Sequence, residues 1–318
     1  MYHFIVNPKS RTGNGLTVWN NVEKVLKQRE ILYQVYFTHY EFHAAKLAKQ
    51  ICETNIGTKH IIVLGGDGTV NEVINGIDSY QDILFGYIPS GSSNDLARSL
   101  GIPKDPIQAL EQILTSKCYR YYDHGIIQTN ESALTKKEPT GLPVNGRKFA
   151  VSTGIGFDAS ICYEALDSNI KRFLNKLKLG KLTYVAIAFK QLIKYQPCDA
   201  KLIIDQHKTI ELKNIFFIAS MIQPYEGGGF KMAPNANPRD QKLSVCAVYN
   251  ISKLKGLLIL IAILFKKQNW LKGVKLFDCE TLDITTKEKL IVHTDGEFAG
   301  RFDHLSIRCT NEQIRMLL

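Results

Sequence analysis

A short apolar run that ends in consecutive glycines constrains the fold of this chain most. Ile61-Ile-Val-Leu64 leads into Gly65-Gly-Asp-Gly-Thr69, and apolar residues then recur at helical spacing from Val70 to Ile77. A strand that passes through a glycine turn into a helix is typical of α/β sheets, in which ligands bind at the carboxyl ends of the strands. Glycine lets the backbone approach an anion closely, and the helix start supplies free N–H groups. The turn therefore predicts a site for a phosphate-bearing ligand.

The aspartate inside this turn narrows the chemistry. Asp67 alone would repel a phosphate, so it fits a turn in which a divalent cation bridges carboxylate and phosphates, or one in which it handles a proton. The alternative is an ordinary glycine-rich turn between strand and helix, and the Asn71-Glu72 pair that follows counts against it. The sequence contains no GxxxxGK[ST] P-loop and no HRD or DFG set, which excludes those two kinds of phosphoryl-transfer site.

Two further loops share this character. One is Asn7-Pro-Lys-Ser-Arg-Thr-Gly-Asn-Gly15, and the other is Ile88-Pro-Ser-Gly-Ser-Ser-Asn-Asp-Leu-Ala-Arg98. Each follows a predicted strand and carries glycine with polar or basic residues. The residues from Ser92 to Asp95 could simply cap the next helix, or they could also orient a ligand. Three such loops at one sheet edge favour a nucleotide site.

Periodicity divides the chain into two predicted domains, and 318 residues suffice to bury two cores. Residues 1–125 alternate strands with helices, which indicates an α/β domain with a largely parallel sheet. The expected strands are 2–6, 33–37, 60–64 and 84–88, and the expected helices are 16–29, 42–54, 70–78 and 105–115.

Residues 126–305 read mainly as strands and turns, which predicts a β-sandwich or open barrel. We expect the final residues, 306–318, to pack back onto the first domain. The expected strands are 201–204, 215–221, 243–249, 281–285, 289–293 and 305–308, the helices are 170–195 and 254–265, and a long loop covers 129–147.

Composition limits location and partners. The net charge of +10 attracts anionic surfaces, whether nucleic acid, acidic lipid or phosphorylated substrates. We expect no nucleic-acid partner, because no basic motif of a known module is present. The seven scattered cysteines show no metal-binding spacing, and the N-terminus shows no secretion leader, so we expect a reduced cytoplasmic protein. The longest apolar run, Leu257–Phe265, is far shorter than the ~20 residues that span a bilayer.

Six motifs in order give a specific resemblance over nearly the whole chain. They are NPxS at Asn7, GGDGTxNEV at Gly65, PxGxxNDxAR at Pro89, GxGxDA at Gly154, GGGxxMAPxAxPxD at Gly227 and DGE at Asp295. This set resembles the bacterial soluble diacylglycerol kinase family, which is related to the catalytic domains of eukaryotic diacylglycerol and sphingosine kinases. The resemblance implies an α/β nucleotide-binding domain, a C-terminal β-sandwich and ATP-dependent phosphorylation of a lipid hydroxyl, most directly that of diacylglycerol.

The resemblance also implies site residues. Asp67, Asp123 and Glu297 match the catalytic group, with Asp67 binding catalytic Mg²⁺ and Glu297 accepting the proton of the lipid hydroxyl. The implied contacts of ATP are Asn7, Pro8, Lys9, Ser10, Arg11, Thr38, Gly66, Asp67, Gly68, Thr69, Val70, Asn71, Glu72 and Ser92.

A second, structural magnesium site is implied in the later half. The family holds this ion by an aspartate and neighbouring carbonyls, which match Asp240 with the carbonyls of Asn237 and Lys242. The family commonly has glycine after the aspartate, whereas this chain has Gln241, which puts the carbonyl geometry in doubt.

A lipid substrate predicts contact with a membrane surface. The basic and apolar residues of 171–182 and of 253–272, which ends near Trp270, are candidate elements for docking on anionic lipid, or else helices packed on the sandwich. An exposed sandwich edge could pair two subunits into a homodimer. Two other functions stay open: a soluble NAD kinase, which shares the GGDGT turn, and a non-catalytic lipid-binding regulator. The sequence does not identify the lipid.

Overall fold

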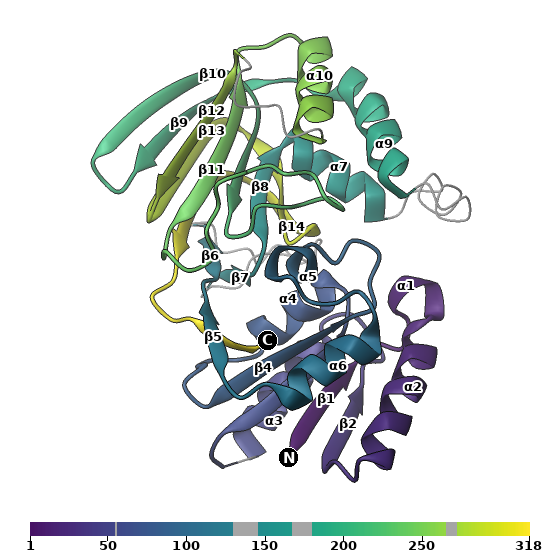
Figure 1. Ribbon diagram of the computed structural model, residues 1–318. Coiled ribbons are helices and arrows are strands. Elements are labelled where there is room, and N and C mark those ends of the chain that lie inside the picture. Colours follow the sequence, from purple (N-terminus) through teal and green to yellow (C-terminus); the bar gives the residue numbers. More distant parts are fainter. Residues whose placement is uncertain (55, 130–145, 167–179, 265–271) are drawn as a thin grey trace. The chain divides into compact units, whose positions relative to one another are not determined.

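The computed structural model describes residues 1–54, 56–129, 146–166, 180–264 and 272–318, which form two compact units (Figure 1). The first unit comprises Met1–His124 and Asn311–Leu318, and the second comprises Gly125–Thr310. Residues 306–310 were expected to return to the first domain, but they belong to the second unit because strand pairing continues to Cys309.

The first unit is an α/β domain built on a six-stranded sheet of order β2-β1-β3-β4-β15-β5. The first four strands are parallel, and β15 runs parallel to β4 and antiparallel to β5. Its strands are β1 (Tyr2–Val6), β2 (Tyr33–Phe37), β3 (Lys59–Gly65), β4 (Ile83–Pro89), β5 (Tyr119–Tyr122) and β15 (Ile314–Leu317). Its helices are α1 (Ser10–Gly13), α2 (Gly15–Gln28), α3 (His43–Thr54), α4 (Asp67–Asn75), α5 (Asp95–Leu100) and α6 (Pro106–Thr115).

Local sequence explains these elements. The apolar run of β3 is buried on both faces, as expected for a central parallel strand. Helix α2 buries Trp19, Val22 and Leu26 along one stripe, and the Trp19 ring lies 5.3 Å from that of Phe4 on β1. Helix α6 starts where the Asp105 side chain accepts two backbone N–H bonds.

The second unit is a β-sandwich-like domain with a nine-stranded sheet of order β12-β11-β10-β8-β13-β14-β6-β7, in which β9 pairs with β10 and β13. Its strands are β6 (Gly125–Gln128), β7 (Arg147–Phe149), β8 (Ser152–Gly156), β9 (Cys198–Ile204), β10 (Lys208–Met221), β11 (Leu243–Tyr249), β12 (Val274–Cys279), β13 (Thr281–Thr294) and β14 (Glu297–Cys309). Its described helices are α7 (Phe157–Leu166), α9 (Gly180–Lys194) and α10 (Lys253–Leu264).

The two faces of this sheet bury two apolar clusters, and β11 shows how one strand serves both. Leu243, Val245 and Ala247 join the cluster formed among the strands. The alternate residues Cys246 and Val248 join the cluster that includes side chains of α7, α9 and α10. The period of two along a strand thus places successive side chains in different cores.

The second unit departs from the predicted elements in two places. Segments 281–285 and 289–293 form one strand, β13, whose register with β14 shifts between Thr285 and Leu290. Helix α7 was not predicted at all. The beginning of the predicted helix 170–195 and most of the predicted loop 129–147 lie outside the described residues. Among the helices that the structure describes, none is long and apolar enough to span a bilayer.

Candidate functional site

The glycine turn after β3 places Asp67 at the first residue of α4. Gly66 precedes the helix in an extended conformation, and its carbonyl accepts the N–H groups of Thr69 and Val70 at 3.0 and 3.1 Å. A Cβ at Gly65 would lie 2.6 Å from the Thr69 side chain, so this position has no room for a larger residue. The turn is therefore built for close backbone approach, as its glycines predict.

The turn after β4 packs directly against the turn after β3. A Cβ at Gly91 would lie 2.5 Å from the Cα of Gly66 and 2.7 Å from Oδ1 of Asn94. Asn94 takes the left-handed conformation, with φ of 50°, and its side chain accepts from the Gly91 N–H and donates to the Gly91 carbonyl, each at 3.0 Å. The two loops that the sequence placed at one sheet edge are therefore in backbone contact.

The Asp67 carboxylate joins these two turns. Its oxygens accept the backbone N–H groups of Asp95 at 2.9 Å and Leu96 at 3.3 Å. Burial, with the nearby charges of Asp67 and Asp95, raises the pKa of Tyr87 well above its ordinary value. The Tyr87 hydroxyl thus stays protonated and donates to Asn94 at 3.2 Å. Asp95 in turn forms an ion pair with Arg98.

The loop after β1 is fastened to the same edge. The Asn7 side chain donates to the Thr69 hydroxyl at 3.1 Å, and the buried hydroxyls of Ser10 and Ser90 lie 2.7 Å apart. Arg11 is exposed and has a left-handed φ of 47°. All three loops singled out in the sequence thus meet at the carboxyl edge of the parallel sheet.

A pocket of about 230 Å³ opens at this edge. Five of its lining residues were predicted to contact the nucleotide: Asn7, Lys9, Thr38, Thr69 and Glu72. Three others were missed: His39, Tyr40 and Glu41. They follow the carboxyl end of β2, so the position of that strand could have identified them even though the loop has no glycine.

The remaining predicted contacts do not line this pocket. Ser92 is exposed, whereas the side chains of Val70 and Asn71 are buried in the domain. Glu72 has a structural contact as well, because its Oε2 accepts the Ala44 N–H at the start of α3 at 3.0 Å. The other members of the predicted set are Pro8, Ser10, Arg11, Gly66, Asp67 and Gly68.

The other two predicted catalytic residues belong to different units. Asp123, in the first unit, is buried and accepts from the Gln313 side chain at 2.6 Å. Glu297, in the second unit, is half-buried at the first position of β14, directly after a two-residue hairpin turn. Asp295 and Gly296 form this turn with φ of 50° and 82°.

Asp295 has a structural role in that hairpin. Its carboxylate accepts the backbone N–H groups of Ala150, Val151 and Ser152 at 2.8 to 3.0 Å. Its own N–H donates to the Ser152 carbonyl at 2.8 Å. The DGE motif is therefore a hairpin turn, which the sequence left open, and its aspartate fixes the turn while Glu297 emerges from it.

The predicted structural metal residues Asn237, Asp240 and Lys242 lie in an exposed loop before β11. The Lys242 N–H donates to the Asp240 carboxylate at 3.1 Å. Gln241 has a φ of 58°, the left-handed region that favours glycine. The backbone here thus keeps a glycine-like conformation despite the side chain.

Comparisons with known proteins agree with this architecture. Residues 1–123 match the diacylglycerol kinase catalytic domain, and residues 160–317 match the YegS C-terminal NAD kinase beta sandwich-like domain. The chain is 30% identical over 303 residues to the Bacillus subtilis (strain 168) protein named "Putative lipid kinase YtlR", covering 94% of each chain. It is 24% identical to a B. subtilis diacylglycerol kinase over 76% of this chain and 71% of that one.

Solved structures share the fold. A Bacillus anthracis crystal structure described as a "putative diacylglycerol kinase" covers 99% of this chain and 96% of its own, with a TM-score of 0.74 and 22% identity. An Archaeoglobus fulgidus NAD kinase, solved with ATP, covers 100% of this chain and 94% of its own, with a TM-score of 0.50 and 11% identity.

Proposed function

This chain belongs to the lipid kinase family that carries a diacylglycerol kinase catalytic domain. We propose that it transfers the γ-phosphoryl group of ATP to the hydroxyl of a lipid, and that diacylglycerol is the preferred acceptor. One observation carries this proposal furthest. Asp67 starts a helix directly after a glycine turn, at the sheet edge where three loops meet and where a pocket lined by Asn7, Thr69 and Glu72 opens. A carboxylate among phosphate-binding backbone groups fits a site that holds a cation and a nucleotide tail.

The pocket and loops would hold the nucleotide. Lys9 adds positive charge to the pocket, and Asn7 and Thr69 present polar groups at its wall. Because Gly66 and Gly91 carry no side chains, the two turns pack together at the start of α4. A helix start favours the binding of anions, so the phosphates would lie there.

The carboxylates would hold magnesium. Asp67 and Asp123 offer carboxylate oxygens, the ligands that Mg²⁺ prefers. The donor chemistry therefore fits the ion. When bound, magnesium neutralises the charge on the phosphates. Asp240 with the carbonyls of Asn237 and Lys242 would hold the second, structural ion.

Glu297 would accept the proton of the lipid hydroxyl. In that step the hydroxyl oxygen forms a bond to the γ-phosphorus, the bond from phosphorus to the β-phosphate oxygen breaks, and ADP leaves. A carboxylate within reach of the hydroxyl takes its proton as the bond forms. The Asp295 contacts to three backbone N–H groups hold the turn from which Glu297 projects, which limits its movement.

The lipid would be delivered at an anionic membrane, with the protein peripheral on its cytoplasmic face. Four large apolar side chains are exposed on two helices that pack together: Phe189 and Ile193 on α9, and Leu254 and Leu258 on α10. The Lys253 ammonium donates to the Ile193 carbonyl at 3.0 Å, which joins the two helices. We call these four residues the α9–α10 patch. Lysines 190, 194, 253 and 255 are neighbours of these residues in the sequence, and Lys190 forms an ion pair with Glu164.

Such a patch suits the interface of an anionic bilayer. Apolar side chains can enter the acyl boundary while the lysines contact anionic headgroups, at roughly 1 kcal/mol per basic residue. Of the two stretches singled out in the sequence, residues 171–179 and the segment around Trp270 lie outside the described residues.

An assay with γ-labelled ATP and Mg²⁺ tests the proposal. The acceptors would be diacylglycerol, a sphingoid base, phosphatidylglycerol and undecaprenol in mixed micelles, with NAD as a soluble acceptor. We expect label in a lipid product, and loss of that label in Asp67→Asn. Label in NAD alone would favour the soluble kinase instead. Binding of ATP without transfer to any acceptor would indicate a non-catalytic regulator.

A further inference from the structure

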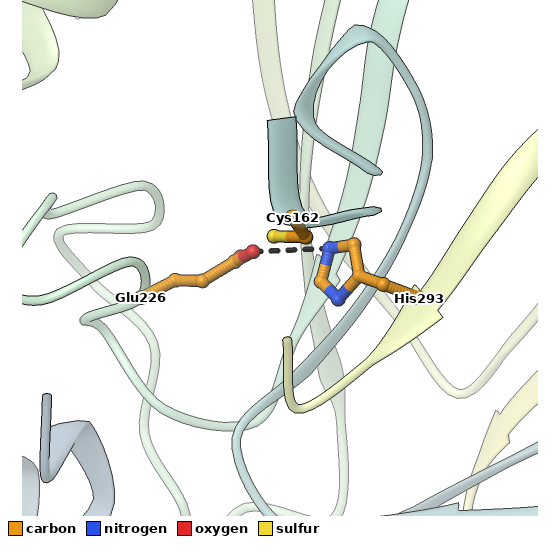
Figure 2. Close-up of side chains that lie close together, drawn as sticks. All are labelled: Cys162, Glu226 and His293. Atoms are coloured by element: carbon orange, nitrogen blue, oxygen red, sulfur yellow. Dashed lines mark ion pairs between the residues drawn. The ribbon is translucent and has the colours of Figure 1, made fainter. Parts of the chain in front are cut away.

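Four buried side chains of types that bind metals gather in the second unit, and none of them is a site residue assigned above. They are Asp158 and Cys162 on α7, Glu226 after β10, and His293 near the end of β13. Each is at most 9% exposed. Figure 2 shows the Cys162, Glu226 and His293 side chains pointing toward one another from three separate elements.

The donor atoms lie close enough together to bind one shared ion. Nε2 of His293 lies 3.0 Å from Oε1 of Glu226 and 3.5 Å from Oδ2 of Asp158. The donor atoms of Cys162, Glu226 and His293 all lie within 4.8 Å of one another. Ligands at roughly 2.0 to 2.3 Å from a tetrahedral zinc ion are about 3.3 to 3.8 Å apart, so a small adjustment would complete this set.

The cluster is poorly satisfied without an ion. Within the described part of the chain, Oε2 of Glu226 is buried and has no hydrogen-bond partner. Oδ2 of Asp158 and Nε2 of His293 also lack a hydrogen bond of good geometry, although Nε2 is in ion-pair contact with both carboxylates. Buried polar atoms are nearly always hydrogen-bonded, so this cluster requires an explanation. A cation among these atoms would bind all three.

The backbone is shaped to make this cluster possible. Asp158 and Cys162 are four residues apart on α7, which places them on one helix face. A Cβ at Gly154 would lie 2.2 Å from Oδ2 of Asp158 and 2.6 Å from Nε2 of His293, so only glycine leaves room for both.

The other two ligands are positioned by irregular backbone. Glu226 is held by paired backbone bonds with Phe230 around Gly227, Gly228 and Gly229, all with positive φ. The register of β13 with β14 shifts between Val292 and His293.

We propose that Asp158, Cys162, Glu226 and His293 form a site for a divalent transition-metal cation, best fitted by zinc. A thiolate, an imidazole and carboxylates are the donors that zinc takes, whereas magnesium and calcium prefer oxygen alone. Because every ligand is buried, the site is of the closed, structural kind and ties α7, the 226–230 loop and β13 together.

The site would also touch the hairpin that carries Glu297. Nδ1 of His293 accepts the Gly296 N–H at 3.2 Å. An imidazole that binds metal through Nε2 usually carries a proton on Nδ1 and donates it. Binding would therefore replace this contact at the hairpin turn, so metal content and hairpin position are linked.

Metal analysis of the purified protein tests this site without any kinase assay. The protein, saturated with Zn²⁺ and dialysed, should retain one zinc ion per chain by mass spectrometry of the metal, and Cys162→Ser should lose it. The matched control is Cys246→Ser, a fully buried cysteine of the same unit outside the cluster, which should keep the ion. Circular dichroism checks that each variant is folded.

A second readout covers the case in which Cys162→Ser does not fold. Added to the metal-free wild type, Co²⁺ should give a thiolate-to-cobalt charge-transfer band, and Glu226→Gln should weaken Co²⁺ binding at least tenfold while Cys246→Ser leaves it unchanged. Wild-type protein that retains no transition metal, shows no cobalt band and melts at the same temperature with or without Zn²⁺ would overturn the proposal. The cluster would then be a set of protonated, hydrogen-bonded side chains.

Discussion

The side-chain carboxylate of Asp67 accepts a hydrogen bond from the backbone N–H of Asp95 across 2.9 Å. The residue proposed to bind catalytic magnesium therefore also holds the start of α5 in place. These two roles respond differently to substitution, because an amide can replace the acceptor oxygen but not the negative charge.

Two variants at Asp67 separate these roles. Asp67→Asn keeps an acceptor for the Asp95 N–H but not for the weaker bond from Leu96, so we expect a folded protein with a smaller loss of stability than Asp67→Ala and a loss of activity of about 100-fold or more. Asp67→Ala leaves two backbone N–H groups without this acceptor and should also lower the free energy of unfolding by about 1–2 kcal/mol. Urea unfolding beside a kinase assay measures both effects. Wild-type activity in Asp67→Asn would remove Asp67 from the chemistry.

The contact of Gly91 with Gly66 predicts that Gly91→Ala damages both fold and activity. The new Cβ would lie 2.5 Å from the Gly66 Cα, so one turn must move. We expect a cost of about 1–3 kcal/mol in unfolding free energy and weaker ATP binding by calorimetry. Ser92→Ala, exposed in the same loop, is the control for stability and should melt like the wild type. Unchanged melting of Gly91→Ala would show that the turns can separate freely.

Neighbouring residues of the DGE hairpin should fail in different ways. Asp295→Ala removes the acceptor of three backbone N–H groups, so we expect a loss of about 3 kcal/mol of stability. Glu297→Gln should leave the melting temperature unchanged and lower kcat by about 100-fold or more, because it removes the proposed proton acceptor. Thermal melting and steady-state kinetics on both variants test this contrast. A kcat near wild type in Glu297→Gln would move the proton transfer elsewhere.

The α/β half could be predicted because short-range sequence patterns determine its strands and helices. The runs of β1 to β4 are apolar and bounded by turns, and α2, α3 and α6 bury one periodic face each. Gly66 and Gly91 predicted turns in which backbone atoms come close to a neighbouring group, and the structure has such a contact between them. The contact between those two turns was not readable, because it joins residues on different strands.

Less of the second half could be predicted from the sequence. Helix α7 was missed because six consecutive residues from Phe157 to Cys162 are buried, which leaves no polar face to mark a period. Asp158 and Cys162 on this helix could not be related to His293 from the sequence, because His293 is more than 100 residues away along the chain. The spacing of the cysteines contains no metal motif, because the proposed ligands come from three separate elements.

Acid should weaken the first unit through two histidines on adjacent strands. Burial is the largest cause that lowers the pKa of both His3 and His60, and nearby positive charges add to it. Both are therefore neutral in the folded state, while the unfolded chain takes up protons near pH 6.5. Their contribution to stability is full above that pH and is lost as the pH falls through the lower folded-state pKa values.

Urea midpoints at pH 7.5 and 5.5 measure this effect. The wild type should lose more stability between these two pH values than the double variant His3→Gln/His60→Gln, which cannot take up those protons. Comparing the two slopes cancels contributions from other titrating groups. Equal losses in the two proteins would show that these histidines titrate normally.

The α9–α10 patch should decide activity on vesicles and leave the chemical step alone. Phe189 and Ile193 are 59% and 75% exposed, and burying either in the acyl boundary is favourable by about 1.5–3 kcal/mol when complete. Phe189→Ser/Ile193→Ser should therefore lower binding to anionic vesicles at least about tenfold even if burial is partial. Leu32→Ser, which changes a 78% exposed apolar residue of the other unit, is the matched control.

Vesicle flotation measures the binding to membranes. Phosphorylation of a soluble short-chain acceptor should be equal in the wild type and in both variants. If the double variant floats like the wild type, the lipid reaches this enzyme by another surface. If activity falls equally on vesicles and on the soluble acceptor, α9 supports the fold of the protein and is not a membrane contact.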